Sequence, residues 1–550
     1  MTATIVHSAG MADPLHWTAT DPAVLWATGN VSEAIPGVSS ALNWSFIDDA
    51  IESAVRRAFH SMGLLRSDEL GLGRRAEDRF MVAFYGRTVA NIEAMRRIGD
   101  RTPGTSGNAL EQQLFGVVRP GVADSPDRSR LAAAVVRMPW MLTRLRSRQA
   151  RHTADVLAWW RRAAMDPPAD LAAARGLLVC ARTLYSRSFE LSTLASMVVQ
   201  ALYDQVVELA VGTGRDGLEH RLVTGYATIL ETGMLSELWD LARNCGDLTS
   251  FLLRHGYHGP GEGQLDSRVW REDPAPLLAL LPRYAALPAD AHPREVLARR
   301  TRIREEAETE FRAALPRTRR AGASVVLRLA RIYLPQREIG KSNYTRSLDG
   351  ARIAARRLGR ALTTAGILDE PDDVFGLTYD EVTGPAAPGD ARKRAAERAA
   401  LRHDYSTTTL ADRWTGPPTR IPFVPNTSRD SAATADPVGT TITGEACGGG
   451  QASGRVRVID NPADVELEQG EVLVCRSTDP SWSSLFPFAS ALVVDLGGRI
   501  SHTAIVAREL GLPCVGCTGD GTARLRTGDL VRVDGDRGSV EVLSRSEDHP

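Results

Sequence analysis

The stretch DLGGRISHTAIVARELGLP, residues 495–513, constrains the fold of this chain more than any other part of the sequence. An apolar run at residues 491–494 precedes it and predicts a buried strand. Two glycines then predict a tight turn. A short helix is predicted to begin at Ser501 or His502 and to end at Leu510, where a glycine and a nearby proline stop it. The stretch therefore predicts a strand, a turn and a helix that starts with a histidine.

His502 is expected beside backbone N–H groups that have no partner within the helix. The positive end of the helix dipole favours a neutral imidazole there and suits an incoming phosphoryl dianion. The spacing thus predicts that His502 carries a phosphoryl group, and that the side chains of Ser501, Thr503 and Arg499 lie near the same helix end and help to bind it. The alternative is a capping or buried histidine in an ordinary strand, turn and helix.

Residues 497–513, GGRISHTAIVARELGLP, resemble the phosphohistidine signature of phosphoenolpyruvate (PEP) synthases, pyruvate phosphate dikinases and rifampicin phosphotransferases. In these enzymes the signature lies in a swivelling domain. The resemblance implies that His502 is phosphorylated in the catalytic cycle and that residues 441–545 form a small α/β (β/β/α) swivelling domain. Short β-rich runs between Gly and Asp turns agree with this. The resemblance also implies phosphotransferase activity and a place in secondary metabolism.

The rest of the chain has a different pattern. Apolar residues recur at three- and four-residue spacing through residues 46–404, which predicts a large irregular all-α domain. The resemblance implies that this domain binds the acceptor of the phosphoryl group. Residues 1–45 are a turn-rich lead or connector, and residues 405–440 are rich in Thr, Pro, Ser, Asp and Ala, which predicts a flexible linker. The expected fold class is multidomain, with the all-α domain followed by the α/β domain.

The segment HGYHGPGE, residues 255–262, predicts a tight and exposed polar loop in the helical domain. It resembles the YGHRGPGE…RWxEDP stretch of the same family. The resemblance implies that His258, Glu262 and Asp266 bind the acceptor. Tyr257 and His258 stand where the family usually has His-Arg, so the sequence supplies no arginine at that position. The alternative is a helix–helix corner with incidental polar residues.

The segment QREIGK, residues 336–341, lies on or enters a helix, so Arg337 and Lys341 share one face. Two cations on one face can grip a phosphoryl group during its transfer. The segment resembles the R-E-x-x-K motif that faces the phosphohistidine in rifampicin phosphotransferases, which implies catalytic roles for both cations. The alternative is an exposed basic face, with Glu338 pairing with a neighbour.

Composition excludes several classes of function. Lys+Arg number 66 and Asp+Glu 67, so the net charge of −1 argues against a nucleic-acid partner. Six scattered cysteines predict neither a disulfide framework nor a metal site. The N-terminus lacks a signal-peptide pattern, and the apolar helix expected at residues 191–210 contains two acidic residues that oppose a membrane crossing. We therefore expect a cytoplasmic protein without a membrane partner.

The source of the phosphate is expected to be another protein. Residues 26–45 resemble the connector that follows the ATP-grasp domain in rifampicin phosphotransferases, and only about 25 residues precede it. The chain has no G-x-x-x-x-G-K-[ST] motif. We expect a separately encoded ATP-grasp protein to bind ATP and Mg²⁺ and to charge His502. The expected acceptor is a hydroxyl, enol or carboxylate of a small metabolite.

Two other functions remain open from the sequence. The chain could be a phosphocarrier or regulatory subunit whose helical domain binds a partner. It could also be an enzyme of non-phosphoryl chemistry that retains the swivelling domain as a lid. Phosphorylation of His502 and turnover of an acceptor separate these possibilities.

Overall fold

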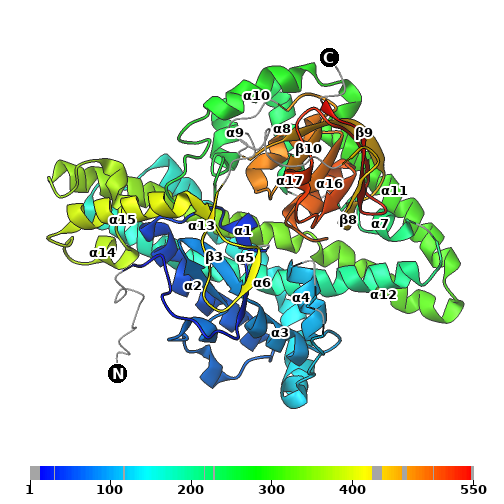
Figure 1. Ribbon diagram of the computed structural model, residues 1–550, viewed down its shortest axis with the longest axis horizontal. Helices are drawn as coiled ribbons and strands as arrows, with labels where there is room; N and C mark the ends of the chain where they lie inside the picture. The colour runs from blue at the N-terminus through cyan, green and yellow to red at the C-terminus, as the bar shows by residue number, and fades with distance from the viewer. Residues whose placement is uncertain are drawn as a thin grey trace.

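The computed structural model describes residues 13–29, 31–115, 118–119, 121–215, 217–226, 230–423, 437–460, 467–499 and 501–546. A large, mainly helical unit forms the N-terminal and central part of the chain, and a smaller α/β unit follows it (Figure 1). This architecture confirms the expected fold class of a large helical domain followed by a small α/β domain.

Helix α13 (Gln336–Thr364) is the central helix of the helical unit. It packs most extensively against α6 (Leu171–Val211) and also against α5 (Leu131–Met165), while α2 (Ala41–Ser61) packs on α6. Their apolar faces form one buried cluster that includes Leu178, Leu191, Leu194, Leu348, Ala351, Ala355 and Leu358. These long helices provide a rigid platform for the residues at their ends.

Helix α6 is 41 residues long, and by length and composition alone it could cross a membrane. In the structure, Leu191, Leu194 and Val198 lie on one buried face, as their spacing predicts. That face packs against the other long helices. The packing is that of a core helix.

The remaining helices surround this core. They are α1 (Val31–Ala34), α3 (Ile92–Arg101), α4 (Gly107–Phe115), α7 (Leu218–Leu222), α8 (Leu230–Ala242), α9 (Leu248–His255), α10 (Ala275–Ala286), α11 (Pro293–Ala314), α12 (Arg317–Tyr333), α14 (Tyr379–Thr383) and α15 (Ala391–Ser406). Helices α8 to α11 lie on the side of the unit that faces the α/β unit (Figure 1).

A small antiparallel sheet departs from the expected all-α domain. Its strand order is β2-β3-β1-β5, formed by β2 (Met81–Phe84), β3 (Arg87–Asn91), β1 (Leu25–Ala27) and β5 (Arg413–Thr415). The strands have only three to five residues each, too few to interrupt a helical pattern visibly. Strand β1 comes from the segment 1–45 that we expected to be a connector.

The stretch 405–440, expected to be a flexible linker, contains paired strands. Strand β4 (Thr408–Thr409) pairs with β6 (Ile421–Pro422), and β5 joins β1 at the edge of the small sheet. Residues 424–436 of this stretch, like residues 1–12 of the expected connector, lie outside the described residues. The first part of the stretch therefore returns to the N-terminal segment and pairs with it.

The α/β unit contains an eight-stranded sheet with the order β7-β14-β13-β9-β10-β11-β12-β8. Strands β9 to β12 run parallel at its centre, and antiparallel strands flank them on both sides. The strands are β7 (Thr441–Thr443), β8 (Glu445–Gly448), β9 (Gln451–Val458), β10 (Val472–Cys475), β11 (Ala491–Val494), β12 (Cys514–Gly516), β13 (Leu530–Asp534) and β14 (Ser539–Ser544). The α-helices among the described residues of this unit are α16 (His502–Leu510) and α17 (Gly521–Arg524).

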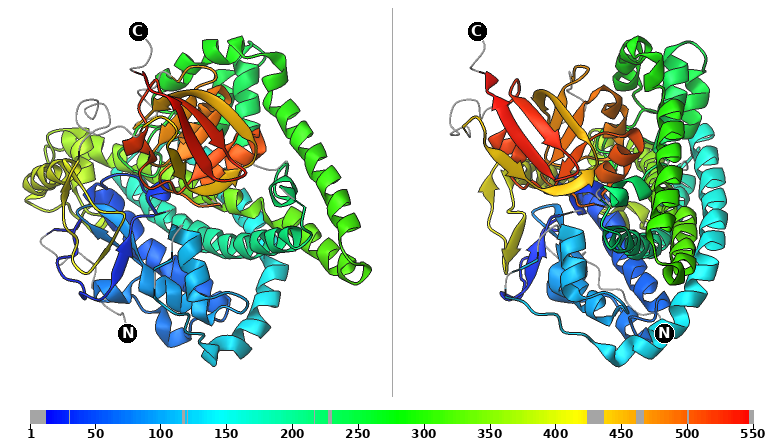
Figure 2. Two further views of the ribbon diagram at one scale, coloured as in Figure 1. Left: turned by 45° about the vertical axis from the view of Figure 1, so that its right-hand side comes forward. Right: turned by 90° about the vertical axis from the view of Figure 1, so that its right-hand side faces the viewer.

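The α/β unit packs against helices of the helical unit, as both views in Figure 2 show. One buried apolar cluster contains side chains from both units, among them Leu235, Leu238, Tyr284, Leu473, Phe486 and Val506. The Tyr284 hydroxyl donates to the carbonyl of Ser484 at 2.7 Å. Thr224 Oγ1 donates to the carbonyl of Arg508, also at 2.7 Å. The two units thus meet through packing of the kind found in a protein interior.

Replacing Gly340 with alanine is expected to destabilise the start of α13. A Cβ at this position would lie 2.9 Å from the Cα of Ser192 in α6, so the two helices would have to move apart. Overpacking of this kind costs about 1–3 kcal/mol, measurable as a lower urea midpoint by circular dichroism. Gly322→Ala in α12 is the control, because its Cβ would meet open space, and it should raise stability by about 0.5–1 kcal/mol. Equal midpoints for the two variants would contradict this account.

Candidate phosphohistidine site

The strand, turn and helix predicted around His502 are present. Strand β11 leads into a turn, and α16 begins at His502 and ends at Leu510. Ser501 caps the helix, because its Oγ accepts the N–H of Ala504 at 3.2 Å. Gly511 follows in the left-handed conformation with φ 73°, which ends the helix as expected. Local sequence therefore places the histidine at the helix start.

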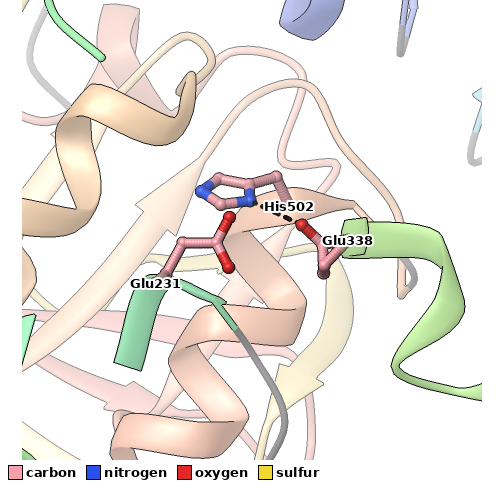
Figure 3. A group of neighbouring side chains, drawn as sticks. All are labelled: Glu231, Glu338 and His502. Carbon is pink, nitrogen blue, oxygen red and sulfur yellow. Dashed lines mark ion pairs between the residues drawn. The ribbon is translucent and has the colours of Figure 1, made fainter. Parts of the chain in front are cut away.

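His502 is fully buried between the two units. Figure 3 shows its ring together with two nearby carboxylates. Its Nδ1 lies 3.5 Å from Oε2 of Glu338, on α13 of the helical unit. Its Nε2 lies 3.0 Å from Oγ of Ser483, in the α/β unit. Each ring nitrogen thus faces a polar group, and the group at Nδ1 comes from the other unit.

The surroundings keep the ring of His502 neutral near pH 7. Burial lowers the pKa of His502 to about 4, with the charge of Lys341 acting in the same direction and the nearby carboxylate of Glu338 opposing it. Burial alone would disfavour the charged form of Glu338. The nearby imidazole of His502 and the charge of Arg337 outweigh burial and lower the pKa of Glu338 to about 2. A neutral imidazole beside an ionised carboxylate has a lone pair available for a phosphorus atom.

Arg337 and Lys341 occupy the first turns of α13 beside the same ring. Arg337 Nη1 lies 2.9 Å from Oε1 of Glu338, and Lys341 is buried with only 8 % of its surface exposed. Both cations act on the pKa of His502. The structure therefore brings together the histidine and both predicted cations, from segments far apart in the sequence.

The loop at residues 255–262, called the glycine-rich loop below, contributes a second buried pair of a histidine and a carboxyl group. His258 Nδ1 lies 2.7 Å from Oε2 of Glu262. Burial, with the charges of Arg346 and Lys341, lowers the pKa of His258 to about 3, while burial raises the pKa of Glu262 to about 8. The loop was predicted to be exposed, but both side chains are buried. The loop packs against α13 of its own unit, where Tyr257 contacts Ser342 and the carbonyl of Glu262 accepts from Arg352.

Asp479 approaches this pair from the α/β unit. Burial and the charge of Glu262 raise the pKa of Asp479 to about 6, and Lys341 opposes this shift. Lys341 has the same opposing effect on Glu262. Three sequence segments, the loop, the start of α13 and the segment after β10, thus converge on one buried lysine.

Arg346 brings a positive charge to the position where the loop lacks an arginine. Its guanidinium carbon lies 4.4 Å from the centre of the Tyr257 ring, and it also hydrogen-bonds to Ser342. The Tyr257 hydroxyl lies 2.9 Å from Oγ of Ser342. A cation stacked on an aromatic ring is stabilised by the ring face. Helix α13 therefore supplies a charge that the loop sequence does not.

Other predicted site residues make different contacts. Asp266 pairs with Arg402 of α15. Arg499 is half-exposed and lies 3.8 Å from Glu445. Thr503 Oγ1 hydrogen-bonds to Oγ1 of Thr478, which holds the segment after β10 against α16. Contact with the imidazole of His502 is shown for none of these three predicted residues, and their binding roles stay predictions.

Sequence reasoning missed three residues that adjoin the ring. Glu338 was considered only as a partner for a neighbouring cation, and Glu231 and Ser483 were not singled out. Ser483 directly follows the polar segment TDPSW, residues 478–482, in the sequence. Glu231 belongs to no motif, so only the fold could place it here.

Glu231, Glu338 and His502 each place one possible ligand atom within 4.8 Å of the others. A histidine nitrogen with two carboxylates could hold Zn²⁺ or a similar divalent cation. Arg337 already pairs with Glu338, and the charge of Lys341 also acts on Glu231. These two cations already balance the negative charge of the carboxylates, and they would repel a metal cation. The geometry therefore permits a metal ion, but the local charge does not require one.

Two stretches of the chain match known families. Residues 467–538 match the family described as PEP-utilising enzyme, mobile domain. Residues 245–338 match the family described as rifampicin phosphotransferase fourth domain. The first stretch contains His502, and the second contains the glycine-rich loop and Arg337.

Whole-sequence comparisons point in the same direction. The chain is 36 % identical to the uncharacterized phosphotransferase YvkC of Bacillus subtilis over 36 % of this chain and 24 % of that protein. It is 30 % identical to a rifampicin phosphotransferase of Streptomyces sviceus over 54 % of this chain and 34 % of that protein. It is 29 % identical to the prodigiosin synthesizing transferase PigC of Serratia marcescens over 55 % of this chain and 34 % of that protein.

The chain is similar to rifampicin phosphotransferases over about half of its length. Residues 467–538 of its α/β unit match the PEP-utilising mobile domain, so this unit is called the mobile domain below. Both points confirm the resemblance stated from residues 497–513. The match spans about a third or less of the length of these curated relatives.

Two hollows lie where the mobile domain meets the helical unit, and His502 lines neither. The first, of about 670 Å³, is lined by residues that include Pro260, Trp270, Leu280, Ser481, Ser484 and Phe488. It adjoins the short 3-10 helix (Pro480–Ser484) that carries Ser483. The second, of about 850 Å³, is lined from both units by residues that include Arg87, Arg402 and Arg476. The lining of the first hollow includes Pro260 of the glycine-rich loop and Ser484, which is next to Ser483, the residue that contacts Nε2.

Lys341→Met is expected to raise the pKa of His502 above its value of about 4, because the charge of Lys341 helps to lower it. NMR titration of protein labelled with ¹³C at histidine Cε1 measures the shift. Lys393→Met is the matched control, since Lys393 is the only other lysine of the chain and lies exposed on α15. An unchanged midpoint in the Lys341 variant would show that this charge does not act on the ring.

Proposed function

We propose that this protein carries a phosphoryl group on His502 from an ATP-grasp protein to a small molecule bound at the helical unit. The observation that carries the proposal is the contact between His502 of the mobile domain and the segment Arg337-Glu338-Lys341 of α13. A histidine carrier set against two cations suits a phosphoryl group in transfer. The matched families and the phosphotransferases among the relatives support the reaction class.

The chemistry divides one transfer into two. The lone pair of Nε2 attacks the donor phosphorus and forms an N–P bond. The acceptor oxygen then attacks the same phosphorus in line, and the N–P electron pair returns to Nε2. Arg337 and Lys341 neutralise the oxygens of the transferring group, Arg337 through its planar fork and Lys341 as a point charge.

The donor step requires the mobile domain to leave the position described here. His502 is fully buried against the helical unit, so a donor phosphate cannot reach Nε2 while this packing holds. The described arrangement therefore corresponds to the acceptor side of the cycle. We propose that ATP and Mg²⁺ are bound by a separately encoded ATP-grasp protein, which charges His502 after the mobile domain swings away.

The acceptor is proposed to be a hydroxyl, enol or carboxylate of a small metabolite. The hollow of about 670 Å³ beside the 3-10 helix is lined by both units and is the proposed place for this acceptor. Its lining includes Trp270, Leu280 and Phe488, which suits an acceptor with an apolar part. The phosphate could remain in the product or serve as a leaving group for a following condensation.

Incubation with ³²P-labelled ATP is expected to label the protein only when the ATP-grasp partner is present. The label should be acid-labile, as expected for phosphohistidine, and His502→Ala should abolish it. Lys341→Met should still accept label but should transfer it about 10²–10³-fold more slowly, because one cation of the clamp is lost. Lys393→Met should behave as the wild type. Scintillation counting of protein and product measures both steps.

The outcomes distinguish the possible functions. Stable label on His502 with no turnover of any acceptor would favour a phosphocarrier or regulatory subunit. Absence of label with every ATP-grasp partner would overturn the proposal and favour a mobile domain that acts as a lid for other chemistry.

A further inference from the structure

The two carboxylate oxygens of Glu338 contact different units of the protein. Oε1 lies 2.9 Å from Nη1 of Arg337 on the same helix, and Oε2 lies 3.5 Å from Nδ1 of His502 on the mobile domain. Nε2 of His502 lies 3.0 Å from the hydroxyl of Ser483. An ionised carboxylate only accepts hydrogen bonds, whereas a hydroxyl can also donate. Nδ1 therefore holds the proton of the neutral ring, and Nε2 holds the lone pair.

The proton on Nδ1 decides how readily a phosphohistidine gives up its phosphate. When Nε2 bears the phosphoryl group and Nδ1 a proton, cleavage of the N–P bond releases neutral imidazole. Without that proton, the same cleavage would release an imidazolate anion, which is a much poorer leaving group. A group that keeps the proton on Nδ1 thus makes the phosphate transferable.

We infer that Glu338 is a positioning residue that holds the proton on Nδ1 of His502 when the mobile domain is docked. Glu338 belongs to the helical unit, so its contact with the ring ends when the mobile domain leaves. Docking itself then activates the phosphohistidine, and the undocked carrier is less reactive toward water during its transit. The inference rests on the proposed function, because it requires a phosphorylated His502.

Of the two carboxyl groups that face the ring, Glu338 is the one whose surroundings favour the ionised form. Glu231, at the start of α8, faces Glu338 and the ring (Figure 3). Burial and the charge of Glu338 raise the pKa of Glu231, which favours its protonated form. The other charged or titratable groups that act on these two carboxyls are Arg337, Lys341 and Glu262. Of the two facing carboxyls, Glu338 is therefore the one that can accept the Nδ1 proton.

The transfer step balances with these groups alone. The N–P bond breaks and its electron pair stays on Nε2. The acceptor oxygen forms the new O–P bond, and its proton passes to a phosphoryl oxygen, which gives a monoanionic phosphate ester. The Nδ1 proton remains on the ring throughout. The released imidazole has the tautomer that the carrier needs to accept the next phosphate.

The test loads full-length protein with phosphoramidate, which phosphorylates histidine without an enzyme. The ³¹P chemical shift of the phosphohistidine is then followed over a pH series, because its midpoint reports protonation of Nδ1. The carboxylate raises this midpoint, so Glu338→Gln is expected to lower it by about one pH unit, a tenfold loss of proton affinity. Glu338→Asp should restore part of the shift. Hydrolysis in the alkaline range should slow in parallel in Glu338→Gln.

Two further variants separate positioning from folding and from docking. Glu190→Gln is the matched control, since Glu190 is also a buried carboxylate among arginines but lies on α6, and its midpoint should equal that of the wild type. Tyr284→Ala removes a buried contact between the units without touching the ring, and it should lower the midpoint as Glu338→Gln does. Circular dichroism verifies that each variant is folded.

The measured midpoints distinguish the inference from the proposed function. Equal midpoints in the wild type and Glu338→Gln would overturn the inference and leave the phosphocarrier role intact. A lowered midpoint in Glu338→Gln with an unchanged one in Tyr284→Ala would overturn the dependence on docking. Failure of His502 to take phosphate from phosphoramidate would overturn both the inference and the proposed function.

Discussion

Removal of one imidazole from water is the physical constraint on which the rest of the site depends. The ring of His502 is fully buried, and burial disfavours its charged form. The same burial raises the pKa values of Glu231, Glu262 and Asp479, so these carboxyls compete for the few cations near them. Lys341 acts on all three, which makes it the electrostatic centre of the site.

The site joins two kinds of structure. A short helix and its cap orient the histidine locally, while two long packed helices hold its partners in place. The start of α13 carries Arg337, Glu338 and Lys341 within two turns, and close packing on α6 fixes that segment. The interface between the units is apolar and well packed, yet the proposed cycle needs it to open. Its polar contacts include those at Tyr284, Thr224 and Tyr226, so separation breaks hydrogen bonds as well as apolar packing.

Sequence reasoning succeeded where the pattern was local. The strand, turn and helix around His502, the strands of the mobile domain and the helical position of Arg337 follow from periodicity and stop residues, and the structure agrees with them. It failed for the small sheet, because three- to five-residue strands carry almost no periodic pattern. It also failed for the exposure of the loop at His258, since the segments that bury the loop lie far from it in the sequence.

The sequence by itself determined which residue can carry phosphate, because helix start, cap and stop are encoded within a dozen neighbouring positions. The tertiary structure alone decided what faces that residue. Each of Glu231, Glu338 and Ser483 lies more than a hundred residues from the next along the chain. Glu231 and Glu338 come together where α8 meets α13, and they face the ring and Ser483 because the mobile domain packs on the helical unit. Charge and proton position depend on distance and burial, which a linear pattern does not contain.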